Sequence, residues 1–208
     1  MMDVKNIYCV GKNYTKHAEE LGSTVPEEPL IFSKPTHSLI KADARHIPLP
    51  NDKGAVDYEA EIIIQLSSEY DAAAGAESCI AAMGLGIDFT LRDEQNKLRQ
   101  EGHPWLTSKG FPNSAAVTDF FPFPGENVMN SSEFSLEING EIAQIGDPKD
   151  MVYKLDDILA HCQQRLGLGA GDLIFTGTPE GVGPVKHGDH LRLLWNGEEH
   201  GSLTVALV

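Results

Sequence analysis

Residues 57–66 read DYEAEIIIQL and place Glu59 and Glu61 inside a run that otherwise favours a β-strand. Side chains alternate between the two faces of a strand, so both glutamates project from one face and Ile62 and Ile64 from the other. The two carboxylates then leave the backbone roughly 7 Å apart. At an effective dielectric constant of roughly 20, like charges at that distance repel by about 2.4 kcal/mol. The stretch therefore predicts a strand with an apolar face and a costly acidic face.

Composition sets the class of protein. The chain has 208 residues, of which 41% are hydrophobic and 23% charged, as in ordinary globular proteins. At this length, folding buries enough surface that disulfides are not required. The formal net charge of −15 argues against a general affinity for nucleic acid or anionic membrane, which bind Lys/Arg-rich surfaces. An anionic substrate is still compatible with this charge, because a metal can make one site locally positive.

The cysteines and the start of the chain indicate a cytoplasmic protein. Cys9, Cys79 and Cys162 are far apart, form no CxxC motif and sit in apolar surroundings, so we expect three reduced core residues. Residues 1–14 lack a basic region followed by a long apolar stretch, so they show no signal peptide. No run of 18 apolar residues predicts a membrane span.

Most of the predicted elements are strands. Asn139-Gly140, between two strand-like runs, predicts a tight hairpin. Strand-like runs cover residues 7–11, 29–33, 58–66, 84–90, 134–138, 141–146, 172–177, 190–195 and 202–208.

Helical patterns are fewer. Residues 154–166 carry an apolar stripe at helical spacing. A second helix is expected to begin at Thr90, where Thr90 and Asp93 fit a capping box, and to end near Gly102. A short helix is expected over 76–84, before the 84–90 strand. Because strands so outnumber helices, we predict an α+β, β-rich fold and not a doubly wound parallel sheet.

A third acid changes the interpretation of Glu59 and Glu61. Alone, an E-x-E pair is typical of the solvent face of a half-exposed strand. Asp88, however, lies in the apolar strand GLGIDFT, which is expected to be buried. Three converging carboxylates are unstable alone but suit a hard divalent cation, which binds oxygen ligands. With no cysteine or histidine in the trio, Mg²⁺ is favoured, with Mn²⁺ as a substitute, over zinc.

Other segments are weaker candidates. His17 and Glu20, three residues apart, share a face of a helical turn, where the carboxylate can orient the imidazole as a base. Lysines in FSKPT (32–36) and SKGFPNS (108–114) are either surface charges or site residues. The glycine-rich segment 175–184 is either an anion-binding loop or a tight turn, and it lacks the lysine of a P-loop.

Taken together, these segments resemble the fumarylacetoacetate hydrolase family. The resemblance runs from Ile7 to Gly188 and is closest to the short branch without a large N-terminal domain. It rests on six motifs in one order: GxNYxxHxxE at 11–20, FxKP at 32–35, ExE at 59–61, DFTLRDxQ at 88–95, PW…K at 104–109 and GTPxGVG at 177–183.

The resemblance implies a mixed β-sandwich roll with a few flanking helices, present as a homodimer. It implies one catalytic domain over 1–208, with 12–30 as a mobile lid. Family members commonly have arginine at the position of Lys12, so the resemblance does not settle whether Lys12 contacts the substrate. The implied roles fall on nine residues: metal ligands Glu59, Glu61 and Asp88; catalytic residues His17, Glu20 and Lys109; and substrate contacts Lys12, Gln95 and Thr178.

The branch acts on small 2-oxo acids through an enolate on a divalent metal. Three carboxylates and one such ion sum to −1, so Lys109 and Lys12 are expected to offset the charge of a dianionic substrate. We favour an oxaloacetate enol–keto tautomerase, with an acylpyruvate C–C hydrolase as the alternative and oxaloacetate decarboxylation as a side activity. In the hydrolase, His17 held by Glu20 would activate water. A non-enzymatic metal-binding scaffold is disfavoured, because none of the implied site residues is lost.

Overall fold

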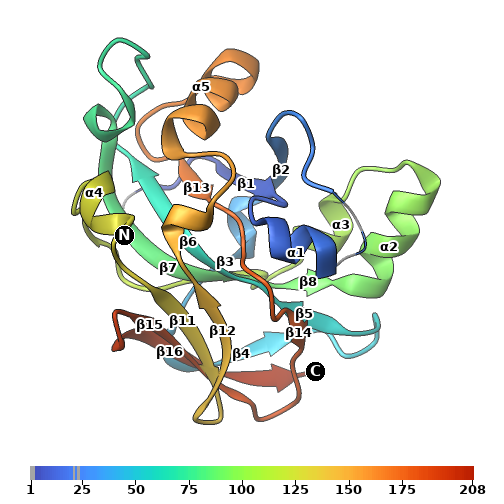
Figure 1. The fold of residues 1–208 in the computed structure, drawn as a ribbon. Helices are drawn as coiled ribbons and strands as arrows, with labels where there is room; N and C mark the ends of the chain where they lie inside the picture. The colour runs from blue at the N-terminus through green and yellow to red at the C-terminus, as the bar shows by residue number, and fades with distance from the viewer. Residues whose placement is uncertain (1–2, 21, 23) are drawn as a thin grey trace.

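The computed structural model describes residues 3–20, 22 and 24–208. Strands dominate it, which confirms the predicted β-rich α+β class. In Figure 1, helices α1, α2 and α3 lie together on one side of a curled sheet and α5 covers another part of it. The helices are α1 (Thr15–Glu20), α2 (Arg92–Glu101), α3 (Leu106–Lys109), α4 (Glu126–Met129) and α5 (Leu155–Leu166).

The largest sheet has the strand order β2-β1-β13-β6-β7-β9-β3, with β10 paired to β7. The two outer strands, β2 and β3, are joined by a short segment from Lys34 to Leu39, which spans at most roughly 18 Å. In a flat sheet they would lie roughly 29 Å apart, so the sheet has to curl into a roll. Its strands are β1 (Ile7–Gly11), β2 (Leu30–Lys34), β3 (Leu39–Lys41), β6 (Ala60–Leu66), β7 (Ile80–Asp88), β9 (Ala115–Val117), β10 (Phe121–Pro122) and β13 (Leu173–Phe175).

Two further sheets complete the fold. The five-stranded sheet has the order β12-β11-β15-β16-β4, and the three-stranded sheet the order β14-β5-β8. Their strands are β4 (Asp43–Leu49), β5 (Val56–Tyr58), β8 (Thr90–Leu91), β11 (Phe134–Ile138), β12 (Glu141–Gly146), β14 (Gly183–Pro184), β15 (His190–Trp195) and β16 (Glu198–Leu207).

Strand β6 separates two apolar cores. Ile62 and Ile64 belong to the large core, which also contains side chains of the five-stranded sheet. Ile63 points the other way, into a smaller core inside the roll with Cys9 and Phe175. The predicted alternation of faces is therefore correct. The acidic face is not solvated, however, because every residue of β6 is buried.

Several predicted elements are confirmed. The strands at 7–11, 134–138, 141–146 and 190–195 have the predicted bounds, and α5 covers nearly the whole predicted helix. Asn139 and Gly140 join β11 to β12 with φ values of 55° and 86°, the left-handed pair expected of a two-residue hairpin loop. All three cysteines are free and buried. As a separate observation, none of the helices in the described residues combines the length and the apolar character of a membrane span.

Three local predictions are wrong. The helix expected over 76–84 is only a 3-10 turn at Ala76–Ser78, and β7 already begins at Ile80 because that segment pairs with β6. The strand expected over 58–66 is divided between β5 and β6 at Glu59. Thr90 does not cap a helix: it lies in β8, and α2 begins at Arg92 without a side-chain cap.

We predict that Gly86→Ala destabilises the fold by about 1–3 kcal/mol. Gly86 lies opposite Glu61 in the β6–β7 pair, and an added Cβ would meet the Ala116 carbonyl oxygen at 2.7 Å and Ile63 at 3.0 Å. Gly169→Ala is the matched control, because its Cβ would meet nothing within 4 Å. Urea unfolding of both variants measures the difference, and equal stability of the two would contradict this packing.

Candidate active site

The structure brings the three predicted acids together at one end of the roll. Glu59 lies between β5 and β6, Glu61 on β6 and Asp88 at the end of β7. One carboxylate oxygen from each lies within 4.8 Å of the others, and all three residues are buried. Because β6 and β7 pair in antiparallel register, with Ala60 opposite Ile87, the acidic positions of both strands fall at the same end.

Lys109 holds two of these acids together. Its Nζ lies 2.7 Å from Glu59 Oε2 and 2.7 Å from Asp88 Oδ2, and donates to Thr90 Oγ1 at 2.6 Å. Helix α3 places the lysine there. The use of the Thr90 hydroxyl at this site, together with its place in β8, explains why the predicted capping box fails.

Lys34 is a second buried cation. Its side chain is fully buried, and its Nζ lies 2.6 Å from Asp88 Oδ1. The same Nζ donates to the Ser114 carbonyl at 3.0 Å and to the Phe89 carbonyl at 3.3 Å. The sequence left open whether this lysine is a surface charge, and the structure places it inside the roll.

Arg92 is a site residue that the sequence analysis missed. Its Nε donates to Asp57 Oδ2 at 2.7 Å, its Nη2 to Glu59 Oε1 at 2.5 Å and its Nη1 to Gln95 Oε1 at 2.7 Å. The available signal was its position in the motif at 88–95, three residues before Gln95 on a predicted helix. Its role depends on Asp57, whose place beside it comes only from the pairing of β5 with β8.

These contacts separate the proton affinities of the two glutamates. Burial would raise the pKa of Glu59, but the charges of Lys109 and Arg92 together hold it well below its ordinary value. Burial and the charges of Asp88 and Glu59 raise the pKa of Glu61 well above its ordinary value. Burial would lower the pKa of Lys109, but Asp88 and Glu59 raise it, so its ammonium form persists at neutral pH. Of the two glutamates, Glu61 therefore holds its proton more tightly and Glu59 loses its proton more readily.

The charge balance differs from the expected one. Four buried acids (Asp57, Glu59, Glu61 and Asp88) face three cations (Lys34, Arg92 and Lys109). With Glu61 protonated the cluster is neutral. Ionised Glu61 together with a divalent cation would give a net charge of +1. The sum of −1 expected from the sequence counted only the carboxylate trio and the ion, whereas Lys34 and Arg92 add two further buried cations.

The carboxylate trio is chemically suited to a hard divalent cation. All three donors are oxygens, which Mg²⁺ and Mn²⁺ prefer. Two oxygens bound to one Mg²⁺ at about 2.1 Å lie at most about 4.2 Å apart, so oxygens within 4.8 Å need only small side-chain shifts. Burial and then the close negative charges of Asp88 and Glu59 raise the pKa of Glu61, and a cation would relieve this charge.

The predicted dyad lies on α1 and faces the same cavity. His17 Nδ1 lies 3.4 Å from Glu20 Oε2, and Glu20 also accepts from the Gly181 N–H at 3.2 Å. Burial lowers the pKa of His17, and the opposing influence of Glu59 and Glu20 does not reverse the shift. The imidazole is therefore neutral at neutral pH and able to accept a proton.

The three predicted substrate contacts line the cavity with the acids. Gln95 is buried, and no residue in the described part of the chain accepts a hydrogen bond from its amide nitrogen. Thr178 Oγ1 accepts from Gln144 Nε2 at 2.9 Å, and Gln144 Oε1 accepts from the Ala60 N–H. Gln144, on β12, was also missed, because nothing in its hairpin sequence points to the site.

The cavity is small. Its volume is about 30 Å³, well below the roughly 300–1,000 Å³ of typical small-molecule sites. Two contacts hold α1 against the 177–184 segment. Glu20 accepts a hydrogen bond from the Gly181 N–H, and Lys16 lies 3.2 Å from Glu180. The mobile lid over 12–30 stays a prediction, and its residues 21 and 23 lie outside the described residues.

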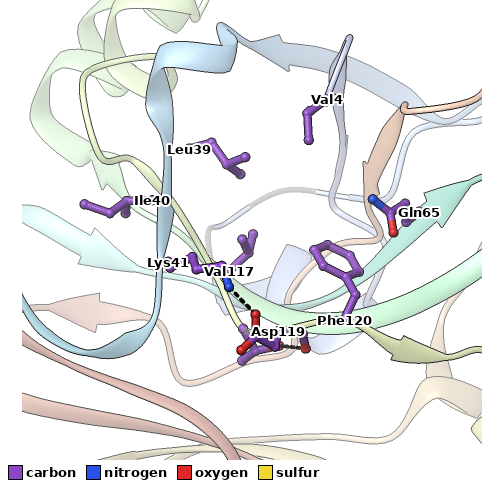
Figure 2. A pocket seen from close by; sticks show the side chains of 9 residues that line it. Val4, Leu39, Ile40, Lys41, Gln65, Val117, Asp119 and Phe120 are labelled. Atoms are coloured by element: carbon purple, nitrogen blue, oxygen red, sulfur yellow. Dashed lines mark hydrogen bonds and ion pairs between the residues drawn. The ribbon is translucent and has the colours of Figure 1, made fainter. Parts of the chain in front are cut away.

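A second, larger cavity does not have the chemistry of this site. It has a volume of about 250 Å³ and is lined mainly by apolar side chains, including Leu39 and Phe120 (Figure 2). Gln65 lines it four residues beyond Glu61, roughly 13 Å along β6. Its two charged residues, Lys41 and Asp119, pair with each other. It therefore offers no unpaired charge to an anionic substrate.

Fold and site together define a known class of enzymes. The chain belongs to the fumarylacetoacetate hydrolase family: residues 6–207 match the family described as fumarylacetoacetate (FAA) hydrolase, C-terminal. The predicted resemblance is confirmed.

Three individual proteins are similar to this chain over most of its length. Oxaloacetate tautomerase YcgM of Escherichia coli (strain K12) is 38% identical over 200 residues, covering 93% of this chain and 90% of the relative. A fumarylacetoacetate hydrolase family protein from Yersinia pestis CO92 superposes with a TM-score of 0.91 at 33% identity, covering 97% of this chain and 93% of that one. Fumarylpyruvate hydrolase from Pseudomonas aeruginosa, solved with Mn²⁺ and pyruvate, has a TM-score of 0.89 at 30% identity, covering 99% and 91%.

We predict that Lys34→Met destabilises the protein by about 3–5 kcal/mol, because it leaves a buried Asp88 oxygen without its cation. Lys41→Met is the matched control, since Lys41 pairs with the exposed Asp119 and should contribute less than about 1 kcal/mol. Denaturant unfolding of both variants in the presence of a chelator makes the comparison. A Lys34→Met protein as stable as the control would show that the buried pair is dispensable.

Proposed function

We propose that this protein is an oxaloacetate enol–keto tautomerase that uses Mg²⁺, with Mn²⁺ as a substitute. One observation carries the proposal: Glu59, Glu61, a lysine kept protonated and a neutral histidine line a single cavity, and Asp88 completes the carboxylate trio beside them. The 38% identity to an oxaloacetate tautomerase supports this reaction over others of the family.

Glu59, Glu61 and Asp88 would hold the cation. When bound, a divalent cation supplies Lewis-acid polarisation of a 2-oxo group. Lys109, Arg92 and Lys34 hold Glu59 and Asp88 in place, and ionised Glu61 would complete the set of ligands. The acids thus need little rearrangement to act as ligands.

Lys109 acts as a fixed positive charge. Its raised pKa excludes it as a base at neutral pH, so its ammonium group stabilises negative charge that develops on the substrate's 2-oxo oxygen. Contacts of 2.7 Å with both Glu59 and Asp88 limit the movement of its Nζ. This positioning requires no reorganisation during the reaction.

His17 moves the proton. Among the titratable side chains that line the cavity, it is the neutral base outside the ion-pair network of Arg92 and Lys109. Glu20 faces its Nδ1, which leaves Nε2 for the substrate. His17 takes the proton from the enol oxygen and returns it to C3, and in the reverse reaction the order is inverted.

An acylpyruvate C–C hydrolase is the second candidate. It is favoured by the similarity to a fumarylpyruvate hydrolase and by a neutral His17 able to activate water. Oxaloacetate decarboxylation would be a side activity of the same site. A homodimeric assembly and a cytoplasmic location stay predictions from the family resemblance.

The proposed reaction is tested by comparing kcat/KM for enol-oxaloacetate ketonisation with that for acetylpyruvate cleavage, both with Mg²⁺. Ketonisation should be faster by at least about an order of magnitude, and Glu61→Gln should abolish metal-dependent turnover of either substrate while the fold is retained. A higher kcat/KM for acetylpyruvate would make the protein a hydrolase. Full activity of Glu61→Gln would refute the metal role.

We predict that His17→Ala lowers kcat for ketonisation by roughly 10²- to 10⁴-fold, because the proton-transferring base is lost. Glu20→Gln retains the base and loses only its orienting charge, so its effect should be smaller, roughly 10- to 100-fold. Metal binding should be unchanged in both. A kcat for His17→Ala close to that of the wild type would assign the proton transfer to another group.

A further inference from the structure

One arginine of this acidic chain has no acidic partner. The sequence contains 31 acidic and 16 basic residues. Of the five arginines, four pair with a carboxylate: Arg45, Arg92, Arg165 and Arg192. The Arg99 side chain makes no ion pair or hydrogen bond to the described residues, and the four residues outside that description (1, 2, 21 and 23) include no acid.

Arg99 lies at the mouth of the candidate active site. It lines the cavity that contains Glu59 and Lys109, and it also lines an open groove outside that cavity. It follows Arg92 by seven residues on α2, so it lies roughly 10 Å further along the helix, on the same face. Arg92 forms ion pairs with Asp57 and Glu59, whereas the Arg99 guanidinium forms no ion pair with the described residues.

A second cation lies close to it. Lys12 lines the same cavity and, like Arg99, forms no ion pair with the described residues. Burial and then the charge of Arg99 lower the pKa of Lys12, which shows that the two cations repel each other. Lys12 also has a left-handed backbone conformation, with φ of 60°, that is uncommon for a non-glycine residue. Two adjacent unpaired cations in a chain of net charge −15 are costly unless an anion compensates them.

We infer that Arg99, together with Lys12, binds the distal carboxylate of a dicarboxylic 2-oxo acid and makes the site selective for such dianions. This inference rests on the proposed function, in which the 2-oxo acid end of the substrate occupies the carboxylate-trio end of the cavity. The other end of the substrate then points toward the mouth. The free amide nitrogen of Gln95, one turn before Arg99, offers a further donor on the way.

The chemistry of the two cations suits this role. A guanidinium group binds a carboxylate through two parallel hydrogen bonds, and an ammonium group adds charge without that geometry. A substrate that ends in a methyl ketone or a methyl group has no distal carboxylate for either cation to bind. Arg99 would thus distinguish oxaloacetate from monocarboxylic 2-oxo acids of the same head group.

The test compares oxaloacetate with pyruvate, which has the same 2-oxo acid head and no distal carboxylate. KM for oxaloacetate and the inhibition constant for pyruvate are measured in one ketonisation assay with Mg²⁺. Arg99→Gln should raise KM for oxaloacetate on the order of tenfold to a hundredfold while the pyruvate constant changes by less than about twofold. Arg99→Lys should recover part of the loss. Lys97→Gln is the matched control, with the same charge change on the same helix and no contact with the cavity.

A loss of affinity for both ligands in Arg99→Gln, or an equal loss in Lys97→Gln, would overturn the inference. So would an unchanged KM for oxaloacetate. If wild-type protein does not turn over oxaloacetate, the proposed function fails by itself. The inference is then decided by calorimetric dissociation constants of pyruvate and oxaloacetate with Mg²⁺: an Arg99-dependent preference for oxaloacetate supports it, and equal affinities refute it.

Discussion

The ammonium group of Lys109, 2.7 Å from both Glu59 and Asp88, is the contact on which the site depends. Buried carboxylates this close repel strongly in a medium of low dielectric constant. Lys109, Lys34 and Arg92 supply three cations against four acids, and burial together with the remaining negative charge raises the pKa of Glu61. The fold supports this balance because the curled sheet brings β6, β7 and α3 to the same place.

The same balance explains how an acidic protein can bind a dianion. Without a cation, the inner cluster is neutral when Glu61 is protonated. A divalent ion bound to ionised Glu61, Glu59 and Asp88 would change the balance to +1, and the charges of Arg99 and Lys12 lie further out at the mouth. Positive charge is therefore concentrated along one cavity while the chain as a whole carries −15. The overall charge says little about the charge that a substrate meets.

Sequence patterns predicted the three acids of the candidate site better than they predicted the residues that hold these acids in place. Glu59, Glu61 and Asp88 were identifiable because acids in apolar strands are costly, and alternation along β6 fixed which residues face the roll. Gln144 and the buried state of Lys34 were not predictable, since each depends on partners more than 30 residues away in the chain. Arg92 was indicated only by its place in the motif at 88–95, because its acidic partners are equally distant. The segment at Ile80 was predicted as a helix because its local composition does not show that it pairs with β6.

The central claim is that Glu59, Glu61 and Asp88 form one divalent cation site. Electron paramagnetic resonance of bound Mn²⁺ tests it most directly, because the method counts ions without requiring turnover. The account predicts one Mn²⁺ per chain in the wild type, displaced by excess Mg²⁺, and none at the same concentrations in Asp88→Asn. Unchanged Mn²⁺ binding in that variant, or no binding in the wild type, would contradict it.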